Sequence, residues 1–74
     1  MTSKAKPGYL NVARIWFNGR RVSAIVERHQ KFWVGVIKNP DWTDYWIGPN
    51  RAKYEDAKLD VEEQYTRMRD NQHA

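Results

Sequence analysis

The dipeptide Asn18-Gly19 lies between two runs of residues that favour β-strands, residues 10–17 and residues 20–28. Asparagine and glycine both tolerate the positive φ angles of a type I′ turn, so this pair is the strongest short-range signal for a β-hairpin. A two-residue turn also determines which residues face each other across the hairpin. The predicted pairs are Phe17 with Arg20, Trp16 with Arg21, Ile15 with Val22, Arg14 with Ser23, and Ala13 with Ala24.

Side chains alternate between the two faces of a strand, so these pairs predict which side chains share a face. The expected core face carries Ala13, Ile15, Val22, Ala24 and Val26. The expected outer face carries Val12, Arg14, Trp16, Arg21, Ser23, Ile25 and Glu27. The hairpin is therefore expected to bury one face and to present a cationic, aromatic face on the other side.

Two further strands are expected after the hairpin. The first covers residues 31–38, and Asn39-Pro40-Asp41 ends it, because proline keeps the preceding residue extended and favours a turn. The second is short, covers residues 44–47, and ends at Gly48-Pro49.

Residues 51–69 have the periodicity of an amphipathic helix. The apolar stripe consists of Tyr54, Ala57, Val61, Tyr65 and Met68. Asn50 is the expected N-cap, and a start one turn later is the alternative. The predicted i,i+4 ion pairs are Arg51 with Glu55 and Glu63 with Arg67. Leu59 falls on the opposite, charged face, where an isolated exposed leucine is ordinary and a protein contact is the alternative.

This order of elements predicts one α+β domain over residues 9–70, an antiparallel three- to four-stranded meander sheet with one C-terminal helix packed on one face. A flexible N-terminal arm is expected over residues 1–8 and a flexible tail over residues 71–74. The chain has 74 residues, which suffice for a single small domain, and its aromatic residues supply apolar area to a small core.

The composition argues against several classes of function. There is no cysteine, so disulfides and thiolate metal sites are impossible, and the two histidines lie far apart in the sequence. No nucleophile with a nearby base and no glycine-rich phosphate loop occurs, so neither an enzyme nor a cofactor is expected. No apolar run suggests a membrane span or a signal peptide, and the expected location is cytoplasmic, or nuclear in a eukaryote.

The formal net charge of +4 is distributed unevenly along the chain. Residues 1–38 carry eight cations and one acid, whereas residues 39–74 carry five cations and eight acids. Such an asymmetry favours an anionic partner for the N-terminal half. A surface that merely keeps a small basic protein in solution is the alternative.

The cations and large rings of the strands are the candidate nucleic-acid-binding residues. They are Arg14, Trp16, Arg20, Arg21, Arg28, Lys31, Lys38 and Trp46. Cationic side chains contact phosphates, and aromatic rings stack on the bases of single strands. Six phosphate contacts predict that the logarithm of the affinity for duplex DNA falls with a slope of about −5 against the logarithm of salt concentration. For Trp16 and Arg21, a surface cation–π pair without a ligand is the alternative.

The string VSAIVERHQKFWVGVIKNPDWTDYWIGPNRAKYEDA, residues 22–57, resembles the AP2/integrase-type DNA-binding domain. The matching pieces are Ala24 nine residues before Trp33, then Trp33-Val34, Ile37-Lys38, Asn39-Pro40, Trp46-Ile47-Gly48 and Glu55-Asp56-Ala57. In that family the outer face of the sheet lies in the major groove of DNA. The resemblance implies that Trp33, Gly35 and Ile37 point at the helix. It also implies that Arg28, Lys38 and Trp46 lie on the outer face in contact with DNA.

The chain departs from the family pattern at several positions. Ser23 and Val26 replace basic residues, Gln30 replaces a tryptophan, and Val36 replaces an acid. An additional basic strand, residues 10–17, either supplies substitute contacts or indicates another use of this face. The hairpin places Val26 inward whereas the family alignment places it outward, and a β-bulge near residues 26–28 would reconcile the two.

The partner expected from these observations is nucleic acid, DNA more than RNA, bound with low sequence specificity. The alternative is a phage- or mobile-element-type protein that regulates or inhibits a host protein complex and binds no nucleic acid itself. Ile25, Val34 and Val36 would then form an exposed apolar patch on the outer face, with Leu59 as a further contact. A second copy covering Val34 and Val36 would make the protein a homodimer rather than a monomer.

Overall fold

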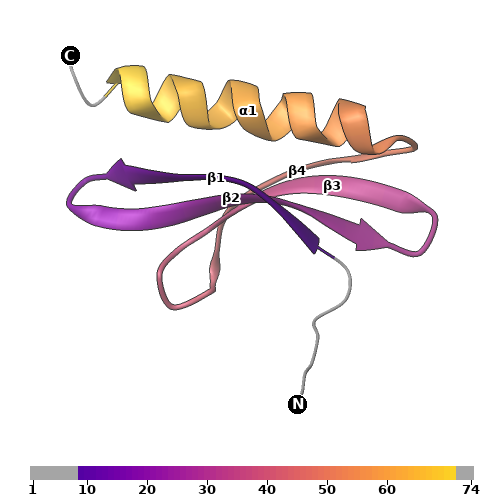
Figure 1. The fold of residues 1–74 in the computed structure, drawn as a ribbon, viewed down its shortest axis with the longest axis horizontal. Helices are drawn as coiled ribbons and strands as arrows, with labels where there is room; N and C mark the ends of the chain where they lie inside the picture. The colour runs from indigo at the N-terminus through magenta and orange to yellow at the C-terminus, as the bar shows by residue number, and fades with distance from the viewer. Residues whose placement is uncertain (1–8, 72–74) are drawn as a thin grey trace.

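The computed structural model describes residues 9–71, which form one antiparallel sheet and one helix. The elements are β1 (Tyr9–Phe17), β2 (Arg20–His29), β3 (Phe32–Lys38), β4 (Asp44–Arg51) and α1 (Tyr54–Asn71). The strands lie in the order β1-β2-β3-β4, and α1 covers one face of the twisted sheet (Figure 1). The predicted α+β meander with a C-terminal helix is confirmed. The predicted arm, residues 1–8, lies outside the described residues, as do residues 72–74 of the predicted tail, whereas Asn71 belongs to α1.

The β1–β2 hairpin has the predicted register. Asn18 and Gly19 have φ angles of 53° and 82°, as a type I′ turn requires. All the predicted pairs, from Phe17 with Arg20 to Ala13 with Ala24, are present. The local preference of two turn residues therefore determined the pairing of both strands.

A bulge in β1 places one residue on the other face. Asn11 faces Ile25 and Ala13 faces Ala24, so Val12 is an additional residue on β1. Val12 packs against the core, and the prediction that it lies on the outer face is wrong. Pairing between β2 and β3 is regular, so the bulge near residues 26–28 that would reconcile the hairpin register with the family alignment does not occur.

The core lies between the sheet and α1. Its buried residues are Val22, Ala24, Val26, Ile37, Ala57, Val61 and Met68. Tyr54 and Tyr65 pack beside them, so the predicted apolar stripe of the helix is confirmed. Leu59 lies on the opposite face and is 62% exposed, as predicted. Val26 is inward, as the hairpin register requires and contrary to the family alignment.

The fourth strand is longer than predicted and continues through Pro49 to Arg51. Proline is tolerated because β4 is an edge strand and its pairing with β3 is irregular there. The helix begins one turn later than Asn50, the alternative that the sequence left open. Arg51 consequently pairs with Asp60, at 2.7 and 3.0 Å, rather than with Glu55. The predicted pair of Glu63 with Arg67 is present at 3.5 Å.

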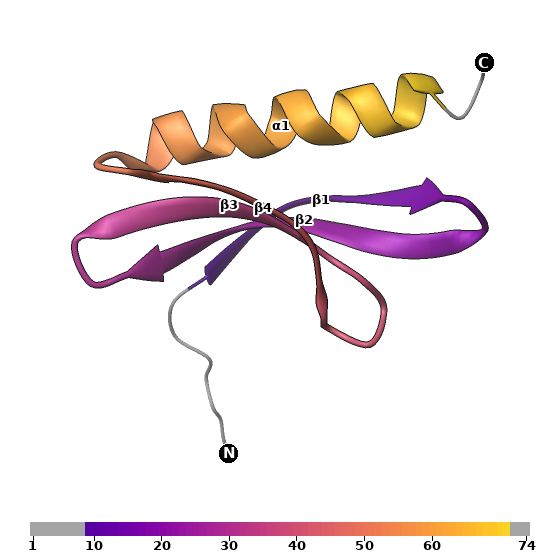
Figure 2. The same ribbon diagram turned by 180° about the vertical axis from the view of Figure 1, so that it is seen from behind.

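The outer face of the sheet has a small core of its own. Ile25, Val34 and Val36 are only 0–4% exposed, and Tyr9 packs against them. The loop between β3 and β4 projects on the side of the sheet away from α1 (Figures 1 and 2). From this loop the ring of Trp42 meets the ring of Tyr9 at 5.6 Å. The prediction that these three apolar residues form an exposed patch is therefore wrong.

Hydrogen bonds close the loop that carries Trp42. The Asn39 amide donates to the Thr43 carbonyl and the Trp42 amide donates to the Asn39 carbonyl, both at 2.8 Å. The Asp41 carboxylate accepts hydrogen bonds from the Thr43 hydroxyl and amide, which lowers the pKa of Asp41. These bonds hold Trp42 at a φ of 72°, a conformation that a bulky side chain rarely adopts.

Candidate nucleic-acid interface

Three of the predicted nucleic-acid-binding residues share one surface at the turn end of the β1–β2 hairpin. Arg14 and Trp16 lie two residues apart on β1, and Arg21 pairs with Trp16 across the hairpin. The Arg21 guanidinium carbon lies 5.2 Å from the centroid of the Trp16 ring, which is 60% exposed. We call Arg14, Trp16 and Arg21 the hairpin cluster.

The arginines at the hairpin turn, Arg14, Arg20 and Arg21, form no ion pair with an acid of the described residues. Arg20 pairs with Phe17, so its side chain leaves the turn on the face of α1. Its charge makes only the smallest contribution to the lowered pKa of Asp41, behind the bonds from Thr43. Three guanidinium groups around the turn are thus available to an anion.

Lys38 lies on the outer face, as predicted, but the protein already satisfies its charge. Its Nζ lies 2.5 Å from Asp44 Oδ1 and 3.5 Å from Glu27 Oε2, and its side chain is 11% exposed. The hydrogen bond to Asp44 is the largest cause of its raised pKa. The ring of Trp42 approaches the same Nζ at 5.7 Å. The positive charge of Lys38 therefore stabilises the packing on the outer face, and little of it remains to attract a ligand.

The other predicted cations lie at the opposite end of the sheet. Arg28 shares the face of Val26 by strand alternation, and its guanidinium carbon lies 5.5 Å from the centroid of Trp33. The implication that Arg28 lies on the outer face is wrong. Lys31 belongs to the turn between β2 and β3 at this end. Because Arg21 and Arg28 are seven residues apart on one strand, about 23 Å separates the two groups of cations.

Trp46 is also on the face of α1, contrary to what the resemblance implied. It pairs with Ile37 and packs against the main core. Between Trp46 and Asp44, which faces Lys38, Tyr45 is an additional residue that shifts the alternation of β4. Trp33, Gly35 and Ile37 do face α1, as the resemblance implied.

Replacement by alanine is expected to destabilise the protein more at Trp46 than at Trp16. Trp46→Ala should lower the free energy of unfolding by about 2–4 kcal/mol, because it leaves a space in the core. Trp16→Ala should lower it by about 1 kcal/mol or less, because an exposed cation–π pair contributes no more than that. Urea denaturation followed by circular dichroism measures both, and equal losses would contradict the assignment of Trp46 to the core.

A hollow that the sequence did not predict lies near the start of β1. It measures about 210 Å³ and is lined by Tyr9, Leu10, Arg28 and Trp33. The sequence predicts a binding role for Arg28 and a core position for Trp33, but it predicts no binding role for Tyr9 or Leu10. The path of the twisted sheet, which the residue pattern does not reveal, brings the four together.

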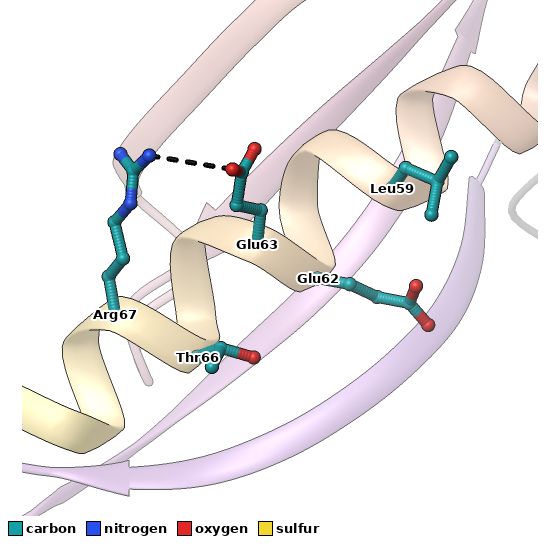
Figure 3. A pocket seen from close by; sticks show the side chains of 5 residues that line it. All are labelled: Leu59, Glu62, Glu63, Thr66 and Arg67. Atoms are coloured by element: carbon teal, nitrogen blue, oxygen red, sulfur yellow. Dashed lines mark hydrogen bonds and ion pairs between the residues drawn. The ribbon is translucent and has the colours of Figure 1, made fainter.

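A shallow depression on the far face of α1 is shown in Figure 3. Its lining residues are Leu59, Glu62, Glu63, Thr66 and Arg67. The ion pair of Glu63 with Arg67 closes one side, and Leu59 lies at the other end. Since all five side chains come from one helix, no second element shapes a site there.

Possible metal-ligand clusters and membrane-spanning helices were sought among residues 9–71. No three histidine, aspartate or glutamate residues in this range lie close enough together to hold a metal ion. In the same range, no helix combines the length and the apolar character that crossing a bilayer requires.

The resemblance to the AP2/integrase-type domain stays a prediction. The outer face, which that family places in the major groove, here carries the Trp42 loop and the ion pair of Lys38 with Asp44. A flat approach of this sheet to duplex DNA is therefore obstructed. Comparison of the chain with protein-family models, curated proteins and solved structures finds no match.

Proposed function

We propose that the protein binds nucleic acid through the hairpin cluster and the neighbouring Arg20. The observation that carries the proposal is the Arg21 guanidinium beside the exposed ring of Trp16, with Arg14 on the same face of the hairpin. Among the described residues no acid is paired with either arginine. Arginine binds phosphate oxygens through two parallel hydrogen bonds, and an exposed indole offers a flat surface for a base.

The charge of the helix supports this choice of surface. Residues 54–71 contain six acids and three cations, so the exposed face of α1 repels a polyanion. A nucleic acid is therefore attracted to the turn of the hairpin and to the outer face next to it.

The expected sequence specificity is low. Base identity is read mainly by hydrogen bonds from side chains to base edges, and phosphate contacts carry no sequence information. The hairpin cluster offers two arginines and a stacking ring, which suit backbone contact and base stacking. The preference for DNA over RNA rests only on the family resemblance.

Salt titration tests the proposal. Three phosphate contacts, from Arg14, Arg20 and Arg21, predict a log–log slope of about −2.7 on duplex DNA and about −2.1 on a single strand. Fluorescence anisotropy of a labelled oligonucleotide over about 0.03–0.3 M salt gives this slope. A slope near −5 would mean that the distant cations also bind phosphate, and absence of binding at low salt would refute the proposal.

The alternative function is that of a protein-binding module, and only one of the four residues predicted for it is exposed. Ile25, Val34 and Val36 are buried within the chain, whereas Leu59 is exposed on α1 beside Glu62 and Glu63. A single leucine on a charged helix face is ordinary for a monomer. A partner that survives nuclease treatment in a pull-down and is lost in Leu59→Ser would favour this alternative.

A further inference from the structure

The hollow between the start of β1 and the end of β2 exists because the sheet turns away from the helix. Leu10 pairs with Val26 and shares its face, yet Leu10 is 49% exposed whereas Val26 is fully buried. The twist carries this end of β1 away from α1, as both ribbon views show (Figures 1 and 2). The helix therefore leaves Leu10 uncovered, and a hollow of about 210 Å³ remains beside it.

The walls of the hollow combine an ordered aromatic ring with a cation. The ring of Trp33 meets the edge of Tyr54 at 5.5 Å, which fixes its orientation. Arg28 lies over Trp33, and its Nε donates a hydrogen bond to the Gln30 carbonyl at 3.3 Å. Within residues 9–71 no acid pairs with Arg28, so its terminal nitrogens keep donors for an anion.

These contacts prepare the site for a ligand before it binds. Arg28 is held by a ring below it and by a carbonyl at its Nε, so little side-chain entropy is lost on binding. Leu10, which is 49% exposed, supplies apolar surface to the same hollow. A flat, largely apolar group that carries a negative charge at one edge fits this combination.

We propose that the hollow binds one nucleotide, with its base against Trp33 and Leu10 and its phosphate at Arg28. An engineered protein cavity of about 150 Å³ holds benzene, so a hollow of about 210 Å³ suffices for one heterocyclic base. In a nucleotide, the flat base suits the apolar and aromatic part of the hollow, and the negatively charged phosphate suits Arg28. This inference deepens the proposed function, and as part of one binding surface it rests on that function.

A single strand, not a duplex, is then the ligand that connects the two sites. The hollow and the hairpin cluster lie at opposite ends of β1, about 27 Å apart for nine residues of extended chain. They also lie on opposite faces of the sheet, so a strand that joins them passes around the sheet edge that β1 forms. A stacked strand advances about 3.4 Å per nucleotide, so about eight nucleotides span this distance. Entry of a base into the hollow requires that it leave its stack, which a duplex opposes by a few kcal/mol.

Chemical-shift titration with thymidine monophosphate tests the hollow directly. In the wild-type protein the nucleotide is expected to shift the indole N–H signal of Trp33 and the amide of Leu10, in the millimolar range. Arg28→Gln and Leu10→Ala should abolish or weaken these shifts, whereas Lys53→Gln, which removes an exposed charge outside the hollow, should leave them unchanged. Shifts at Trp16 alone, or equal shifts with inorganic phosphate alone, would overturn the proposal. Thermal unfolding of each variant verifies that it is folded.

A second titration separates this inference from the proposed function. A single-stranded oligothymidylate of about twelve nucleotides should bind Arg28→Gln about five- to tenfold more weakly than wild type, the effect of losing about one phosphate contact. Unchanged affinity of that variant, with weakened binding by Arg14→Gln/Arg21→Gln, would refute the hollow and leave the proposed function standing. Shifts at Trp33 with the mononucleotide, without oligonucleotide binding, would refute the proposed function and leave a mononucleotide site.

Discussion

Replacing Arg14 and Arg21 by glutamine is expected to weaken nucleic-acid binding by roughly 25- to 60-fold near 0.1 M salt, the weaker effect for a single strand and the stronger for a duplex. Each lost phosphate contact reduces the affinity because fewer counterions are released on binding. The salt slope should also become shallower by about 1.4–1.8. Fluorescence anisotropy with the same labelled oligonucleotide over a series of salt concentrations measures both changes.

The matched control for this variant is Lys53→Gln/Arg67→Gln. It removes the same two positive charges, but from the segment before α1 and from the far face of α1, where Arg67 pairs with Glu63. Its affinity should stay within about twofold of wild type, since distant surface charges are largely screened. Equal weakening by both double variants would mean that net charge, and not the hairpin cluster, governs binding.

Both double variants should keep the stability of the wild-type protein. Arg14, Arg21, Lys53 and Arg67 are all exposed. Substitutions of such residues usually change the free energy of unfolding by about 0.5 kcal/mol or less. A loss of affinity in Arg14→Gln/Arg21→Gln at unchanged urea midpoint therefore reports on the interface itself.

Gly35→Ala is expected to be strongly destabilising, with a loss of about 3 kcal/mol. A Cβ at this position would lie 2.8 Å from the carbonyl oxygen of Ala57 and 2.8 Å from the Cβ of Val61. These atoms belong to the buried face of α1 and cannot move aside unless the whole helix shifts. A domain of this size has a total stability of only about 4–11 kcal/mol, so much of it would be lost.

Urea denaturation followed by circular dichroism measures the effect, and Gly19→Ala is its control. Gly19 has nothing within 4 Å of an added Cβ, but its φ of 82° penalises any side chain, by about 1–2 kcal/mol. The same chemical change thus tests crowding at one site and backbone strain at the other. An unchanged midpoint for Gly35→Ala would contradict the close packing of α1 on β3.

A double variant distinguishes crowding at Gly35 from other causes. Val61→Gly removes the Cβ that would lie 2.8 Å from the added methyl group, so its combination with Gly35→Ala should cost less than the two separate losses together. Residues in direct contact show coupling energies of about 0.5–3 kcal/mol in such cycles. Strict additivity would place the cause of the Gly35→Ala loss away from Val61.

Features that depend on neighbouring residues were predictable from the sequence. The Asn18-Gly19 turn determined the pairing of β1 with β2, because the conformation of a two-residue turn fixes the first pair and alternation fixes the others. The helix stripe from Tyr54 to Met68 followed from periodicity alone. Leu59 was correctly placed on the far face for the same reason.

Features that depend on irregular pairing were not predictable. Val12 and Tyr45 are additional residues in β1 and β4, and each shifts the alternation of the strand around it. Trp46 therefore faces the core although the resemblance placed it outside. Trp42 had no role in the sequence interpretation, since only the folded loop brings its ring to Tyr9 and Lys38.

The sequence by itself determined how many strands and helices form and how the cations divide between the two halves of the chain, because both follow from local preference and composition. Only the tertiary structure decided which cations meet. Opposing acids on β2 and β4 neutralise Lys38, and the length of β2 separates Arg28 from Arg21. The twist of the sheet leaves Leu10 uncovered beside Trp33. Long-range geometry of this kind depends on the path of every strand at once, which no short stretch of residues encodes.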